Sequence, residues 1–250
     1  MNSVRVNLFT PQQALDAVLA RLGQACSFTL YTLNLDHVVK LRANAEFQQA
    51  YANADFVSAD GWPIVWHFRR LGVRLRRTTG ADLLAPLCEK AAERGVPVFF
   101  IGPQDHVQRR ALARLKQRYP ALVVAGADAS IIDPEDPKTM DALTQRVSAS
   151  GARLCFVCLG APKQELVASA LKSRCSGVGF LCVGAALDFL SGTVRRAPPW
   201  VQSAGMEWAW RLTYDPLRLA PRYLRCAEVF LLIALRRLPF VFSAQPASGS

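Results

Sequence analysis

Leu154-Cys-Phe-Val-Cys-Leu-Gly-Ala-Pro-Lys-Gln-Glu165 is the stretch that decides the fold. An apolar, β-prone run stops at Gly160, and Pro162 then opens a predicted helix with polar residues in its first turn. In an α/β sheet, such a corner points backbone N–H groups and polar side chains into the crevice at the strand's carboxyl end. A solvated helix N-terminus is the plainer alternative, but the stretch favours a ligand site.

The same alternation of strand and helix continues on both sides of this corner. Strands are predicted at residues 27–35, 56–58, 96–101, 122–125, 153–159 and 178–183, and helices at 10–23, 38–53, 63–71, 81–94, 106–119, 137–150 and from 163 onward. This alternation predicts an α/β fold with a largely parallel sheet covered by helices on both faces.

The chain changes character near residue 194. From Arg195 onward every basic residue is an arginine, and prolines and tryptophans recur. We therefore expect an α/β catalytic core over residues 1–194, an arginine-rich helical appendage over 195–242 and a disordered tail over 243–250. If a helix starts after Pro221, its arginines and apolar residues form an amphipathic helix suited to an anionic membrane surface. A terminal helix docked on the core is the alternative, and a docked helix can also touch lipid.

Composition narrows the partners and the chemistry. The 250 residues carry a net charge of +11, which favours phosphates, nucleotides, nucleic acid or anionic lipid as partners. The seven cysteines lie mostly in apolar runs, as buried free thiols in a reducing compartment do. Cys155 and Cys158 have metal-ligand spacing, but residues three apart on a strand face opposite sides. The histidines are isolated, and no metal site is predicted.

Further polar motifs follow the other predicted strands. The motifs are Thr32-Leu-Asn34, Asp60-Gly61, Arg76-Arg-Thr-Thr-Gly-Ala-Asp82 and Gly184-Ala-Ala-Leu-Asp188. Each has a plainer explanation: a helix cap for Asn34, a simple turn for Asp60-Gly61, a solvated charge run for the arginines and, for the last motif, only a weak nucleotide corner.

Taken in order, the motifs resemble the WecG/TagA/CpsF family of bacterial glycosyltransferases (glycosyltransferase family 26). The resemblance runs from about Thr32 to Arg225. Its landmarks are Thr32-x-Asn34, Asp60-Gly61, Arg77-x-x-Gly80, Gly160-x-Pro162-Lys-Gln-Glu165, Gly184 with Asp188, Gly192 with Arg196-Ala-Pro198, Glu207-Trp208-x-x-Arg211 and Pro216-x-Arg218-x-x-x-Arg222-Tyr223.

The resemblance implies a Rossmann-like core and an inverting, metal-independent enzyme that needs no cofactor. Such enzymes move a sugar from a UDP-sugar to a polyprenyl-diphosphate-linked saccharide in bacterial surface polysaccharide synthesis. The donor sugar would be glucose, N-acetylmannosamine or its uronate. The implied location is the cytoplasm, peripheral on the inner face of the plasma membrane. The implied partners are the two substrates and an anionic membrane surface bound through the appendage, with no nucleic acid, and a homo-oligomer is left open.

The resemblance also assigns roles to residues. Asp60 matches the family's proposed catalytic base. The expected substrate-binding residues are Thr32, Asn34, Arg77, Gly160, Gln164, Glu165, Gly184 and Asp188 in the core, and Arg196, Arg218, Arg222 and Arg225 in the appendage.

Two other classes compete with this interpretation. A non-catalytic basic RNA- or nucleotide-binding α/β module would explain the net charge and the crevice motifs, and it predicts salt-dependent RNA binding. It does not explain an amphipathic C-terminal helix. A Rossmann-type methyltransferase would need a glycine-rich turn after the first strand, where this chain has Thr32-Leu-Asn34.

Overall fold

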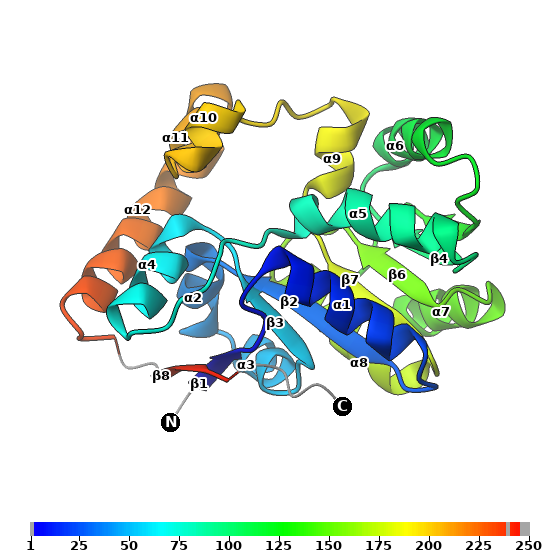
Figure 1. Cartoon of the computed structure of the whole chain (residues 1–250), viewed down its shortest axis with the longest axis horizontal. Coiled ribbons are helices and arrows are strands. Elements are labelled where there is room, and N and C mark those ends of the chain that lie inside the picture. The colour runs from blue at the N-terminus through cyan, green and yellow to red at the C-terminus, as the bar shows by residue number, and fades with distance from the viewer. Residues whose placement is uncertain (1–2, 239–240, 246–250) are drawn as a thin grey trace.

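Six parallel strands form the central sheet of the computed structural model, which describes residues 3–238 and 241–245 (Figure 1). In spatial order the strands are β3 (Phe56–Ala59), β2 (Phe28–Leu33), β7 (Gly179–Cys182), β6 (Leu154–Val157), β4 (Val98–Ile101) and β5 (Val124–Asp128). Every pairing between neighbours in this sheet is parallel. The predicted α/β class and largely parallel sheet are therefore confirmed.

Helices cover both faces of this sheet, and each face has its own apolar core. Leu30 of β2 belongs to one core and Tyr31 to the other, as the alternation of side chains along a strand requires. On one face lie α1 (Pro11–Leu22), α5 (Gly80–Glu93), α6 (Asp105–Arg118) and α9 (Ala186–Ser191). On the other lie α2 (Leu35–Leu41), α3 (Ala45–Ala52), α4 (Trp62–Arg70), α7 (Pro137–Ala149) and α8 (Lys163–Arg174).

The predicted helix over residues 38–53 is in fact two helices, α2 and α3. Asn44 interrupts it, because its side chain accepts a hydrogen bond from the backbone N–H of Phe47 (2.7 Å) and so starts a new helix. The capping side chain competes with continued helix, which a periodic apolar pattern alone does not reveal.

The appendage consists of α10 (Pro199–Ser203), α11 (Glu207–Tyr214) and α12 (Pro216–Ala234), beside the core in Figure 1. Helix α12 begins at Pro216 and contains Pro221, so the predicted start after Pro221 was too late. Its buried side chains pack towards α2 and α4. They are Leu219, Cys226, Val229 and Ile233. The helix therefore docks on the core.

The two ends of the chain meet in a second, small sheet. β8 (Val241–Ala244) pairs in parallel with β1 (Ser3–Val6). The predicted disordered tail from residue 243 therefore begins too early, because residues 243 and 244 are paired strand. The rest of that prediction falls on residues 246–250, which lie outside the described residues. Among the helices that the structure describes, none is both long and apolar enough to span a bilayer.

Candidate active site

The carboxyl ends of β2, β3, β6 and β7 carry the predicted crevice motifs. The ends of β2 and β3 are joined directly, since the backbone N–H of Asp60 donates to the carbonyl of Leu33 (2.7 Å). Asn34 follows β2, and its side chain accepts from the backbone N–H of His37 (3.1 Å). Asn34 therefore caps α2, as the alternative explanation held, while Thr32 is almost fully buried.

Asp60 is half-buried at the end of β3. Burial raises the pKa of its carboxyl to about 7, Arg77 and Arg211 oppose the rise, and Glu207 and Asp82 add to it. A carboxyl with that pKa can accept and release a proton near neutral pH, which suits a general base. Gly61 follows with a backbone φ of +92°, a conformation in which a side chain would be strained.

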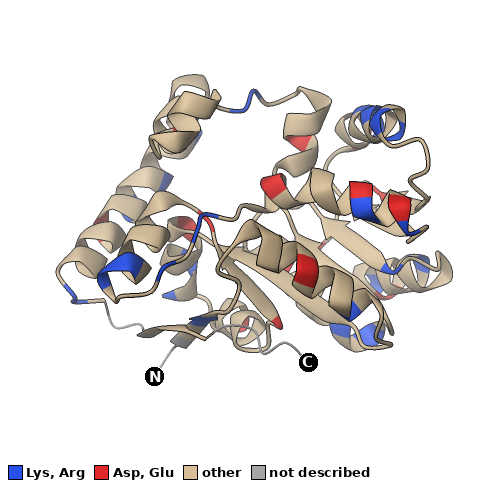
Figure 2. Ribbon diagram, in the orientation of Figure 1, with Lys and Arg blue, Asp and Glu red and all other residues tan. Residues whose placement is uncertain are grey.

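Arginines and carboxylates alternate next to Asp60. Nη1 of Arg77 lies 2.6 Å from Oε2 of Glu207. Nη2 of Arg196 lies 2.5 Å from Oδ1 of Asp82, and Arg77 approaches Asp82 at 4.0 Å. Charged segments of α5, α9 and the α9–α10 linker lie on the same side of the sheet in Figure 2. The cluster joins the core to the appendage.

Arg211 belongs to this cluster too, although sequence reasoning placed it only within a motif. The guanidinium carbons of Arg196 and Arg211 each lie 5.7 Å from the centre of the Phe189 ring, a cation–π distance. Arg211 also opposes the burial that raises the pKa of Asp188. The sequence does contain a signal for Arg211, because Glu207 and Arg211 are four residues apart and therefore share one face of the predicted helix.

The corner after β6 is tied to the corner after β7. Oε1 of Gln164 accepts from the backbone N–H of Gly184 (3.0 Å), and Nε2 of Gln164 donates to Oε1 of Glu165 (2.7 Å). Gln164 is 3% exposed and Glu165 is 0% exposed. In this conformation the Glu165 side chain has no surface to offer a ligand, and its predicted substrate contact stays a prediction.

Open space lies over the two glycines of these corners. Gly160 and Gly184 have positive φ angles, +73° and +57°, and a Cβ added at either would meet nothing within 4 Å. A ligand can therefore approach the backbone closely at both positions. Asp188 is half-buried in α9, just after the second corner.

Three of the appendage arginines predicted to bind substrate have other surroundings in this conformation. Arg218 pairs with its neighbour Asp215 on the surface, and Arg225 is exposed. Nε of Arg222 lies 2.9 Å from Oδ1 of Asp36, an ion pair that lacks hydrogen-bond geometry. Arg222 therefore holds α12 against α2. The appendage arginine whose charge acts on Asp60 is instead Arg211, and Arg196 pairs with Asp82, whose charge also acts on Asp60.

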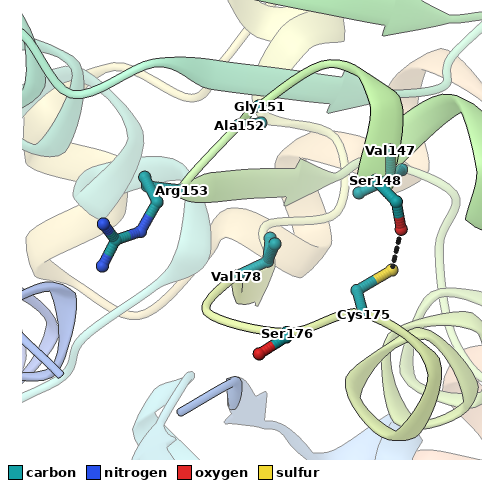
Figure 3. A pocket seen from close by; sticks show the side chains of 8 residues that line it. All are labelled: Val147, Ser148, Gly151, Ala152, Arg153, Cys175, Ser176 and Val178. Carbon is teal, nitrogen blue, oxygen red and sulfur yellow. Dashed lines mark hydrogen bonds between the residues drawn. The ribbon is translucent and has the colours of Figure 1, made fainter. Parts of the chain in front are cut away.

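Metal ligands and a hollow elsewhere on the molecule bear on where the chemistry can take place. In the part of the chain that the structure describes, no group of three or more His, Cys, Asp and Glu side chains is arranged to hold a metal ion. A hollow of about 390 Å³ opens at the amino ends of β6 and β7, opposite the crevice (Figure 3). Its one charged side chain, Arg153, already donates to the carbonyls of Gly177 and Leu22. The hollow is therefore not a candidate for the chemistry.

A carboxyl of raised pKa beside arginines, at the carboxyl edge of a parallel α/β sheet, is typical of an enzyme active site. Residues 1–241 match the family described as the Glycosyl transferase WecG/TagA/CpsF family. Because the match covers nearly all of the 250 residues, the chain belongs to this family and is a glycosyltransferase with a sugar donor and an acceptor. The resemblance noted in the sequence is thereby confirmed, and the non-catalytic module is set aside.

Proposed function

We propose that this enzyme transfers a sugar from a UDP-sugar to a polyprenyl-diphosphate-linked saccharide, with inversion at the anomeric carbon. The reaction would take place on the inner face of the plasma membrane, during bacterial surface polysaccharide synthesis. The observation that carries the proposal is Asp60, whose carboxyl has a pKa of about 7 and feels the charges of Arg77 and Arg211 at the carboxyl edge of the sheet.

In the proposed reaction, the Asp60 carboxylate takes the proton of the acceptor hydroxyl. The hydroxyl oxygen forms a bond to the anomeric carbon from the face opposite UDP. The bond between that carbon and the β-phosphate oxygen breaks, and its electron pair leaves with UDP. A single displacement of this kind inverts the anomeric configuration and needs only one protein carboxylate as base.

Negative charge that builds on the departing diphosphate needs a positive partner. Arg77, Arg196 and Arg211 lie in one cluster with Asp60 and can supply it through charge-assisted hydrogen bonds. Asp82 and Glu207 neutralise Arg196 and Arg77 when the donor is absent. The open backbone over Gly160 and Gly184 leaves room for the donor beside these arginines.

The surface of the appendage supports action on a lipid-linked acceptor. Leu217, Leu224 and Leu231 recur every seventh residue of α12 and are 91%, 73% and 59% exposed. Side chains at that spacing share one helix face. Trp200, 71% exposed, adds an aromatic side chain, and the appendage arginines lie near this apolar surface in the sequence. Exposed leucines and tryptophan with arginines suit the interface of an anionic membrane.

The test is transfer from UDP-glucose, UDP-N-acetylmannosamine and its uronate to a short-chain lipid-diphosphate sugar, with the product anomer read by NMR. Asp60→Asn should lose at least about a hundredfold in rate while remaining folded. Asp16→Asn is the matched control, because Asp16 is exposed on α1. A folded Asp60→Asn enzyme with near-wild-type turnover would refute the base. Loss of activity in EDTA that added metal restores would refute metal independence.

A further inference from the structure

The buried carboxyl of Glu165 is not used by the reaction proposed above. It lies in the first turn of α8, beneath the corner after β6. Tyr31 of β2 donates its hydroxyl to the backbone carbonyl of Glu165 (3.1 Å). Nδ1 of His37, on α2, lies 4.0 Å from Oε1 of Glu165. The Glu165 side chain is therefore enclosed by core elements and has no access to a ligand.

The charge of Lys40 lowers the pKa of this carboxyl only in part, and the charge of Asp36 opposes it. Burial lowers the pKa of His37 to about 3, so its ring is neutral, and Nδ1 lies 2.6 Å from the hydroxyl of Tyr51. Lys40 binds Asp36 (2.5 Å) and the carbonyl of Ala161 (2.9 Å) instead. The remaining titratable neighbours, neutral because burial raises their pKa values, are Tyr31, Tyr51 and Cys182.

An ionised carboxylate at such a position would be costly, because the cost of desolvation exceeds what its hydrogen bonds and the charge of Lys40 return. Burial raises the pKa of Glu165 to about 8, opposed by its hydrogen bond from Gln164. Oε2 is buried without a hydrogen-bond partner and is the oxygen that would carry the proton. At neutral pH the side chain is then a neutral acid, with Oε1 as its hydrogen-bond acceptor.

That acceptor decides how the Gln164 amide is oriented. With Nε2 facing Oε1 of Glu165, the amide oxygen faces the backbone N–H of Gly184 and accepts from it. The flipped amide would set its NH2 group against the N–H of Gly184, a contact of two donors. The acceptor of Glu165 and the N–H of Gly184 therefore together select the one orientation in which Gln164 links the two corners of the crevice.

We propose that Glu165 is a positioning residue, whose buried carboxyl accepts from Gln164 and orients it so that Gln164 fixes the Gly184 corner on which the donor lies. Gln164 then acts mainly as a link between the corners after β6 and β7 rather than as a direct contact to the sugar. This inference rests on the proposed function, because it takes the space over Gly160 and Gly184 to be the donor site.

The test compares Glu165→Gln, Glu165→Leu, Gln164→Leu and the double leucine variant. Glu165→Gln keeps a neutral acceptor and should change the donor KM less than about twofold at pH 7. The two single leucine variants should each raise the donor KM by about tenfold, roughly the value of one hydrogen bond, with a smaller change in kcat. The double variant should match either single variant, because all three break the same link.

The pH profile supplies a readout that general damage to the fold would not give. Above about pH 8 the wild-type carboxyl ionises and becomes a stronger acceptor for the Gln164 amide, so the link tightens and the donor KM should fall there. Glu165→Gln has no such group and should keep a flat donor KM over that range. A Glu165→Gln variant that is folded but as impaired as Glu165→Leu would overturn the inference, as would additive effects in the double variant.

Calorimetric binding of UDP separates the two proposals. If wild-type enzyme fails to bind UDP, the proposed donor is wrong. If wild-type enzyme binds UDP and folded Glu165→Leu binds it equally well, the positioning role of Glu165 alone is overturned. Far-UV circular dichroism and thermal melting establish that each variant is folded before it is scored.

Discussion

Nη1 of Arg77 lies 2.6 Å from Oε2 of Glu207, so the segment before α5 is joined to α11 of the appendage. The two residues are 130 positions apart in the chain. Of the charges that act on Asp60, Arg77 lowers the pKa of its carboxyl the most and Glu207 raises it the most. The appendage therefore acts directly on the electrostatics of the predicted base.

The transfer rate should depend on pH through Asp60. Its carboxyl must be ionised to accept a proton, and burial holds its pKa at about 7. The rate should therefore fall about tenfold for each pH unit below that value. Initial rates at saturating substrate from about pH 5 to pH 9 measure this limb. A flat rate down to about pH 5 would contradict a base of raised pKa.

Replacing Glu207 by glutamine should move this acidic limb to lower pH. Glu207→Gln removes a negative charge that raises the pKa of Asp60, so the carboxyl ionises more readily. The control is Glu93→Gln, since Glu93 is exposed at the end of α5 and pairs with Lys90. An unshifted limb in a folded Glu207→Gln enzyme would mean that α11 does not rest beside Asp60 during turnover.

The Asp60 carboxyl should reduce the free energy of unfolding at neutral pH. The folded-state pKa of Asp60 is above its ordinary value of 3.8, so the native state holds a proton that the unfolded state has lost between about pH 4 and pH 7. Stability from this group falls as pH rises through that window. At pH 8, Asp60→Asn should have a higher melting temperature than wild type, with a free energy of unfolding larger by at most about 4 kcal/mol. Near pH 3, where the Asp60 carboxyl is protonated in both the folded and the unfolded state, the variant and wild type should melt at the same temperature. A lower melting temperature at pH 8 would contradict the assignment.

The sequence could predict the parts of this fold that are set locally. Apolar strands followed by glycine or polar corners placed the sheet and the carboxyl-edge motifs. Chain-distant pairings were out of reach, among them Arg77 with Glu207, Arg222 with Asp36 and β8 with β1. The burial of Glu165 was also out of reach, because adjacent polar residues in the first turn of a predicted helix do not show which of them face the core.

Membrane binding should depend on the exposed leucines of α12. Leu217→Asp with Leu224→Asp places charge on the predicted lipid-facing side, so binding to anionic vesicles should weaken by at least about tenfold. Ile131→Asp is the control, because Ile131 is 94% exposed and lies outside the appendage. Sedimentation with phosphatidylglycerol and phosphatidylcholine vesicles measures the effect. Equal binding by the double variant and the control would show that α12 does not face lipid.

Shortening the chain at residue 194 cannot test the appendage cleanly, because the appendage also completes the core. Val229 and Ile233 are buried in it, and Phe242 of β8 packs its ring against Phe68 with centroids 6.2 Å apart. A point variant is sharper. Phe242→Ala should destabilise the protein by about 3 kcal/mol, since it removes a mostly buried aromatic side chain.

The position of Phe242 also predicts where that variant first becomes loose. β8 ties the C-terminal end of the appendage to β1, while the α9–α10 linker ties its other end to α9. Loosening one tie should expose the linker, so trypsin should cut Phe242→Ala faster than wild type at Arg195 or Arg196. Leu235→Ala, which changes a side chain 62% exposed, should leave both melting temperature and cleavage rate unchanged. If Phe242→Ala loses stability but its linker is cut no faster, then β8 stabilises the core without restraining the appendage.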